Sequence, residues 1–215
     1  LVYLNTAEVN SYLDQIKTRN WPVSEIGFTG GEPFMNPDMI DMTRAALSRG
    51  YDVLILTNAM RPMMRKTMQQ GLLELSAEFP GKLCLRISLD HYSAGRNDEF
   101  RGDGSFATTL EGMKWLRDSG IRMAVAGRTV WGESESEHRA GYRALFTEHG
   151  FDIDAGNPME TVLFPEMDET VEVPEITTAC WDILGKSPND VMCASSRMVV
   201  KRLGAEHPVV LACTL

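Results

Sequence analysis

Hydrophobic and polar positions along the chain show two kinds of periodicity, one typical of strands and one typical of helices, in alternating segments. Short runs rich in β-branched residues predict strands, and longer amphipathic runs with helical spacing follow them. The predicted strands are 24–29, 51–59, 82–90, 121–130 and 159–164, and the predicted helices are 7–18, 36–50, 61–79, 105–120 and 134–150. Strands that alternate with helices are typical of a parallel sheet with right-handed crossovers.

Several of these helices have the residues that start or stop a helix. Asn5 precedes the first helix, Asn36 and Pro37 open the second, and Ser105 is expected to cap the fourth, which Gly120 ends.

The strand at 82–90 separates two α/β architectures, an open doubly wound sheet and a barrel. Its apolar residues fall on one face and its polar residues on the other, as Leu83, Leu85, Ile87 and Leu89 against Cys84, Arg86, Ser88 and Asp90. In an open sheet covered by helices on both faces, a polar strand face would be buried against apolar side chains. The inside of a barrel that holds a ligand accommodates such a face. Arg122 and Arg128 repeat the pattern in one phase of the strand at 121–130, so we expect an incomplete or open barrel.

The regular alternation ends near residue 165, where "PEMDETVEVPE" reads as an acidic, proline-bounded linker. We therefore predict a barrel domain at 1–165 and a C-terminal extension at 166–215. Within the extension, "SRMVVKRLG" and "HPVVLACTL" are expected to pair as a β-hairpin around Gly204.

Composition excludes several classes of function. A net charge of −9 argues against general binding of nucleic acid or anionic membranes. No apolar run approaches the roughly 20 residues of a membrane span, and the first residues lack the features of a signal peptide. We expect a cytoplasmic protein whose four cysteines are thiols or metal ligands rather than disulfides.

The stretch Gly30-Gly31-Glu32-Pro33 lies where a strand ends and a helix is about to begin. Sites of parallel α/β proteins lie at such ends. Two glycines let a ligand approach the backbone, Glu32 can accept from an ammonium group, and Pro33 fixes the turn. The arrangement suits the amino group of an amino-acid-like ligand; a plain turn with a surface glutamate is the alternative.

The segments "FTGGEPFMNPDMIDMTRAALSRGYDVLILTNA" and "RISLDHYSAGRNDEFRGDGSF" resemble the core of radical SAM enzymes. The resemblance extends to about residue 165. It implies a partial (β/α)6 TIM-like barrel that holds S-adenosylmethionine (SAM) against a [4Fe–4S] cluster. Reductive cleavage of SAM then gives a 5′-deoxyadenosyl radical, which takes hydrogen from a substrate.

The resemblance assigns cofactor-binding roles to residues of this chain. It places Gly30, Gly31, Glu32 and Pro33 at the methionyl amino group, Asn58 near the ligand, Ser88 and Asp90 at the ribose hydroxyls, and Arg128 at the methionyl carboxylate. The strand at 162–164 would line the adenine. Arg101 matches the family, as a ligand-site or loop-ordering residue. The structural alternative for Asp90 is that it caps a turn, and for Arg128 that it pairs with a surface acid.

The chain departs from the family in one respect. A CxxxCxxC loop holds the cluster in the family, and no cysteine precedes the glycine pair here, while Cys84 is a lone strand residue. We expect the first barrel strand and the cluster ligands to lie outside this chain, which would be a fragment inactive on its own. A degenerate relative without the chemistry is the alternative.

Three cysteines fall in the last 36 residues, at Cys180, Cys193 and Cys213. They are candidate ligands of an auxiliary Fe–S cluster in a SPASM-like extension, and we expect them to converge; buried or reactive thiols are the alternative. The four histidines, His91, His138, His149 and His207, lack metal-ligand spacing and are expected to be ordinary surface or loop residues.

The sequence thus predicts a radical SAM enzyme core. It assigns no catalytic residue, and it leaves the substrate open among a peptide, a metabolite and a protein side chain. A flavodoxin or ferredoxin would be the reductant. Two rivals remain, a barrel lyase that uses Glu32 and Asp90 as acid and base, and a non-catalytic remnant that binds SAM or a protein.

Overall fold

A computed structural model describes residues 2–165, 170, 172, 175 and 177–212 of the chain. It separates into two compact units, one of Val9–Glu166 and one of Leu1–Glu8 with Met167–Leu215. The first helix, α1 (Thr6–Thr18), crosses from one unit to the other. Asn5 caps it as expected, because the Asn5 side chain accepts from the Glu8 N–H and the Glu8 carboxylate accepts from the Asn5 N–H.

The larger unit contains one sheet of five parallel strands. These are β1 (Glu25–Phe28), β2 (Asp52–Thr57), β3 (Leu83–Ser88), β4 (Arg122–Arg128) and β5 (Thr161–Phe164). They pair in chain order, each parallel to the next. The sequence prediction of an α/β partial barrel with parallel strands is confirmed.

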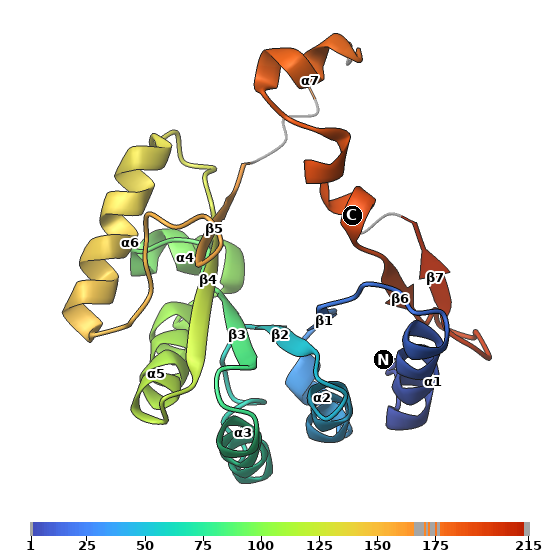
Figure 1. Cartoon of the computed structure of the whole chain (residues 1–215). Coiled ribbons are helices and arrows are strands. Elements are labelled where there is room, and N and C mark those ends of the chain that lie inside the picture. The colour runs from blue at the N-terminus through green and yellow to red at the C-terminus, as the bar shows by residue number, and fades with distance from the viewer. Residues whose placement is uncertain (1, 166–169, 171, 173–174, 176, 213–215) are drawn as a thin grey trace. The chain divides into compact units, whose positions relative to one another are not determined.

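Helices follow the strands along the chain. They are the 3₁₀ turn η1 (Pro33–Met35), α2 (Met39–Leu47), α3 (Lys66–Glu78), α4 (Ala94–Arg101), α5 (Ser105–Asp118) and α6 (Glu135–His149). The strands follow a curve, and α2, α3, α5 and α6 lie along its outer side (Figure 1). Gly71 of α3 allows close packing on α2, because a Cβ there would lie 2.7 Å from the Ile40 side chain.

The two faces of β3 differ as the sequence predicted. Leu83, Leu85 and Ile87 are buried on the helix side, where each fully buried aliphatic side chain stabilises the fold by about 1.5–3 kcal/mol. Cys84, Arg86 and Ser88, on the inner face, remain half-buried. Strand β3 therefore has one apolar outer face and one polar inner face.

The sequence pattern missed one helix before α5, and the cap expected for α5 is wrong. Helix α4 was not predicted because it lacks an apolar stripe, and Asn97 is its buried residue. Ser105 is the first helical residue of α5 and not its cap; Gly104 occupies the cap position with φ of 75°. The Ser105 hydroxyl instead donates to Asp98 at 2.8 Å.

The smaller unit contains α7 (Ala179–Leu184), η2 (Pro188–Asp190), α8 (Met192–Ser195) and the strands β6 (Met198–Val200) and β7 (Val209–Leu211). The two strands pair antiparallel, which confirms the predicted hairpin. Lys201 beside the hairpin forms an ion pair with Glu8 at 2.6 Å, which lowers the Glu8 pKa. No helix in the described part of the chain has the length and apolarity that crossing a bilayer requires.

Candidate functional site

The predicted ligand-binding residues lie at or just beyond the carboxyl ends of the first four strands. Gly30, Gly31, Glu32 and Pro33 follow β1, Asn58 follows β2, Ser88 ends β3 with Asp90 two residues later, and Arg128 ends β4. Adjacent parallel strands bring these ends to one edge of the sheet. The described structure thus places all eight at the edge where parallel α/β proteins bind ligands.

The glycine pair after β1 presents open backbone. Gly30 has φ of 101° and Gly31 φ of 48°, a region that favours glycine. Both residues are exposed, and a Cβ built on either would meet no atom within 4 Å. A ligand can therefore approach these peptide groups without displacing a side chain.

Glu32 holds the turn after β1 against the end of β2. Its Oε1 accepts from the Phe34 N–H at 3.1 Å and from the Thr57 hydroxyl at 2.8 Å. Its Oε2 accepts from the Asn58 N–H at 2.9 Å. A carboxylate has about four acceptor sites, so these three bonds leave room for about one further donor. The turn role and the ligand role of Glu32 are therefore compatible.

Glu32→Gln is expected to lower the free energy of unfolding by about 1–3 kcal/mol. The Gln NH₂ would replace a carboxylate oxygen that accepts a hydrogen bond, so two donors would face each other. Chemical denaturation of the chain measures this. Glu111→Gln, at an exposed position on α5, is the matched control and should change little. Equal midpoints for the two variants would show that the Glu32 bonds carry no net stability.

Both backbone groups of Asn58 are hydrogen-bonded. Its N–H donates to Glu32, and its carbonyl accepts from the Thr109 hydroxyl of α5 at 3.1 Å. Its side-chain oxygen accepts from the Met60 N–H at 2.9 Å. The side-chain NH₂ makes no hydrogen bond within the described part of the chain, so Asn58 has a donor to offer at this edge.

Asp90 is the buried charge of the edge, with 3% of its surface exposed. Its Oδ1 accepts from Arg101 at 2.9 Å and lies 3.5 Å from Nε of Arg128. The Asn97 side chain accepts from its backbone N–H at 3.0 Å. Two of the predicted ligand residues, Asp90 and Arg128, are thus paired, and Arg101 holds the carboxylate in place.

Arg128 keeps a large part of its side chain accessible. Half of it, 49%, is exposed, and the guanidinium lies 5.4 Å from the centre of the Phe100 ring. Phe164, its register partner at the end of β5, is also exposed. An exposed guanidinium beside aromatic rings can bind a carboxylate through its fork of donors.

The loop between α4 and α5, in the motif "RGDGSF", is organised by Asp98. Its carboxylate accepts from the N–H groups of Gly104 and Phe106 and from the Ser105 hydroxyl. The Phe106 N–H, followed by the other donors, holds the Asp98 pKa below its usual value against a smaller opposing effect of burial. This fixes the loop that follows Arg101.

A depressed carboxylate pKa gives stability that is present above the unfolded pKa and is lost as the pH falls through the lower folded pKa. Asp98→Asn is therefore expected to destabilise the chain at about pH 7 and progressively less below about pH 4. Denaturation at a series of pH values measures this, with the exposed Asp103→Asn as control. A stability difference that does not change with pH would contradict the assignment.

Two of the four histidines were misjudged from the sequence. His91, in the loop after β3, is 1% exposed, and His138, in α6, is fully buried. Both lie beside Glu133, in the loop before α6. A sequence signal was available: the Ser134–Glu137 capping box places Glu133 and His138 at the N′ and N4 positions, which contact each other at a helix start.

The described residues test the cysteine predictions only in part. Burial raises the pKa of Cys84, which favours the protonated thiol over the thiolate. Cys180 is half-buried and free. The Cys193 side chain and all of Cys213 lie outside the described residues, so convergence of the three late cysteines stays a prediction.

Comparison with known proteins identifies the class. The model of the radical SAM superfamily matches residues 2–140, well over half of the chain. The chain belongs to the radical SAM superfamily, whose members are enzymes that use SAM and a [4Fe–4S] cluster.

Individual relatives differ in their substrates. The antilisterial bacteriocin subtilosin biosynthesis protein AlbA of Bacillus subtilis is 37% identical over 99 residues, which are 46% of this chain and 21% of AlbA. An AdoMet-dependent heme synthase of Oleidesulfovibrio alaskensis is 28% identical over 123 residues, 57% of this chain and 29% of the synthase. The chain thus spans less than a third of these curated relatives.

Solved structures share the fold at low identity. Streptococcus suis SuiB matches 85% of this chain and 39% of its own with a TM-score of 0.58 and 17% identity. The structure of anSMEcpe with bound AdoMet matches 79% of this chain and 42% of its own with a TM-score of 0.53 and 12% identity. These likenesses support the partial-barrel fold.

The residues at the strand ends fit SAM. The exposed peptide groups of Gly30 and Gly31 suit the amino group, and the exposed Arg128 suits the carboxylate. The three-cysteine motif that holds the superfamily's cluster does not occur in these 215 residues, so no cluster ligand is assigned here.

Proposed function

We propose that this chain binds SAM at the strand-end edge and forms the core of a radical SAM enzyme that acts on a peptide. The observation that carries the proposal is the arrangement of open glycine backbone, Asp90 and Arg128 at one edge of a radical SAM fold. A cytoplasmic location, expected from the composition, and a flavodoxin or ferredoxin reductant, expected from the resemblance, remain predictions.

Each polar part of SAM has a partner in this proposal. The backbone of Gly30 and Gly31 and the remaining acceptor site of Glu32 bind the ammonium group, while Arg128 binds the methionyl carboxylate. Ser88 and Asp90 bind the ribose hydroxyls. Asp90 already accepts from Arg101, so its orientation is set before the ligand arrives.

When SAM is bound to a reduced [4Fe–4S] cluster, its cleavage supplies the radical that removes hydrogen from a substrate. The residues of this chain contribute binding and orientation. Their positions on strand ends, braced by the Glu32 and Asp90 hydrogen bonds, limit how far the ligand can move.

A peptide is the substrate class that AlbA, at 37% identity, supports. AlbA serves the biosynthesis of a bacteriocin, and structural neighbours were solved with peptides bound, SuiB with precursor peptide SuiA and anSMEcpe with Kp18Cys. The counterexamples are three heme synthases and an Fe-coproporphyrin III synthase, at 27–30% identity. We therefore place a peptide first and a porphyrin second.

The rival lyase gains little support from the geometry. Glu32 accepts three hydrogen bonds within its turn, and Asp90 is held by Arg101 and Arg128. An acid–base pair needs protons that can be exchanged with a substrate, whereas these carboxylates are engaged as acceptors.

Binding of SAM to the natural protein that contains this chain, purified with its cluster, tests the first part of the proposal. Arg128→Ala should weaken SAM binding about 10-fold or more, because it removes a charged hydrogen bond. Arg122→Ala is the matched control, on the same face of β4 at its opposite end. Equal affinities for the two variants would overturn the carboxylate assignment, and no binding to the unaltered protein would favour a non-catalytic remnant that binds a protein.

The substrate class is tested separately. The natural protein with SAM and dithionite is offered peptides encoded beside its gene or, in parallel, iron coproporphyrin III. Formation of 5′-deoxyadenosine that rises with a peptide, together with a mass change of that peptide, supports the proposal. A rise with the porphyrin instead would contradict the peptide assignment while leaving the SAM site intact.

A further inference from the structure

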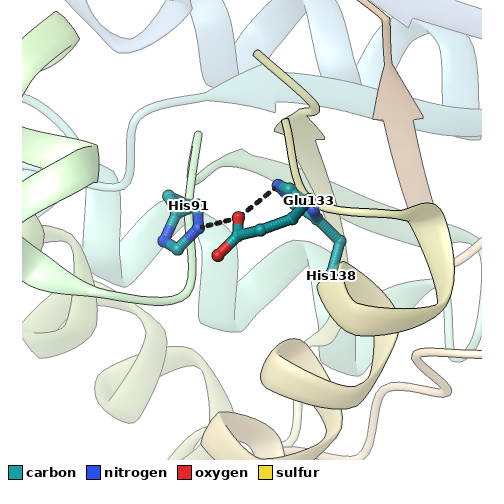
Figure 2. A group of neighbouring side chains, drawn as sticks. All are labelled: His91, Glu133 and His138. Atoms are coloured by element: carbon teal, nitrogen blue, oxygen red, sulfur yellow. Dashed lines mark hydrogen bonds and ion pairs between the residues drawn. The ribbon is translucent and has the colours of Figure 1, made fainter. Parts of the chain in front are cut away.

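The second cluster of chemistry-bearing side chains is His91, Glu133 and His138. Nε2 of His91 lies 3.1 Å from Oε2 of Glu133, and Nε2 of His138 lies 3.5 Å from the same oxygen. Figure 2 shows both rings directed at this one oxygen. One candidate ligand atom from each residue lies within 4.8 Å of the others.

The two separations from Oε2 of Glu133 are close to the edges of a metal coordination shell. Bonds of about 2.0–2.1 Å in a tetrahedral zinc site place neighbouring ligand atoms about 3.3–3.4 Å apart. The two measured separations lie on either side of that value. Two imidazoles and one carboxylate are also a known zinc donor set, with a fourth position left open.

His138 supplies an independent observation. It is fully buried, and neither ring nitrogen has a hydrogen-bond partner among the described residues. A buried polar group without a partner is costly, so an imidazole in this state calls for a ligand. Its Nε2 faces Glu133, the direction in which the other two candidate ligand atoms lie (Figure 2).

We propose that His91, Glu133 and His138 form a binding site for a zinc ion, separate from the SAM site. The ion would join the loop after β3 to the start of α6. The loop after β3 contains Asp90 directly before His91, so the ion would brace a neighbour of the SAM-binding residues without touching them.

The surroundings of Glu133 suit such a role. Its Oε1 accepts from the Tyr92 hydroxyl at 3.1 Å and faces Arg96, while Oε2 is left for the imidazoles. The carboxylate is therefore oriented by groups on the side away from the proposed ion.

Binding moves one proton within His91. The Ser93 N–H donates to Nδ1 at 2.9 Å, so the metal-free ring carries its proton on Nε2 and shares it with Glu133. Coordination through Nε2 shifts that proton to Nδ1, where the Ser93 hydroxyl at 2.8 Å accepts it. Ser93 is thus a positioning residue. The hydrogen bond from the Ser93 N–H to Nδ1 of His91 is lost when the ion binds.

The test uses the 215-residue chain with Cys180, Cys193 and Cys213 changed to Ser, which removes the late thiolates. After chelation and addition of Zn²⁺, dialysis and metal analysis should find about one equivalent per chain. His138→Gln and Glu133→Gln should lose it, with circular dichroism as the check on folding. His207→Gln, at an exposed histidine, is the control and should retain it.

X-ray absorption of the zinc-loaded chain gives a result that needs no variant. Bonds of about 2.0–2.1 Å support nitrogen and oxygen ligands, whereas a shell at about 2.3 Å would place the ion on sulfur and overturn the proposal. Ser93→Ala should weaken zinc binding about 10–100-fold as a lost outer-shell partner. Binding well below one equivalent, or equal binding by His138→Gln, would leave a hydrogen-bonded carboxylate–histidine cluster only.

Discussion

Asp90→Asn is expected to lower the free energy of unfolding of this chain by about 3 kcal/mol, the lower end of the range for breaking a buried ion pair. Asp90 is 3% exposed and accepts from Arg101, whose side chain is 23% exposed. Removal of the carboxylate charge leaves this guanidinium without its counterion. The partial exposure of Arg101 keeps the cost below the maximum.

Denaturation of the variant and of Asp103→Asn, an exposed aspartate in the loop between α4 and α5, measures the effect. Arg101→Met added to Asp90→Asn should recover part of the loss, because it removes the unpaired cation. In the natural protein, Asp90→Asn should also reduce SAM affinity. A large loss of stability with unchanged SAM affinity would mean that Asp90 orders its loop and does not bind the ribose.

Gly112→Ala should also destabilise the chain by about 3 kcal/mol, the upper end of the range for overpacking. A Cβ on Gly112 of α5 would lie 1.9 Å from the carbonyl oxygen of Ala59. That oxygen is backbone and cannot swing aside, and Ala59 itself has φ of 56°. The helix or the loop that carries Asn58 must move.

Gly95→Ala in α4 is the matched control, since a Cβ there meets no atom within 4 Å. Alanine inside a helix is favoured over glycine by about 0.5–1 kcal/mol, so this control should be neutral or slightly stabilised. Denaturation midpoints of the two variants give the comparison. Similar midpoints would contradict the close approach of α5 to the loop after β2.

The sheet could be predicted because its signal is local. Alternation in "KLCLRISLD" assigns each residue of β3 to a face, and the buried and half-buried positions follow that assignment. The hairpin of the smaller unit was predictable for the same reason, from two β-rich runs about a turn. Such patterns depend on residues close in sequence.

The parts that were missed depend on contacts between distant segments. Helix α4 has no apolar stripe, so periodicity could not find it. His91 and Glu133 are 42 positions apart and meet because two neighbouring strands end at the same edge. The pairing of Asp90 with Arg101 likewise follows from α4 folding back on the loop, which no spacing rule predicts.

A structure of the natural protein with its cluster and SAM bound tests the central claim most directly. The account predicts the methionyl amino group against the backbone of Gly30 and Gly31, the ribose beside Asp90 and the carboxylate on Arg128. SAM bound away from the carboxyl ends of β1–β4, or with its carboxylate remote from Arg128, would contradict it.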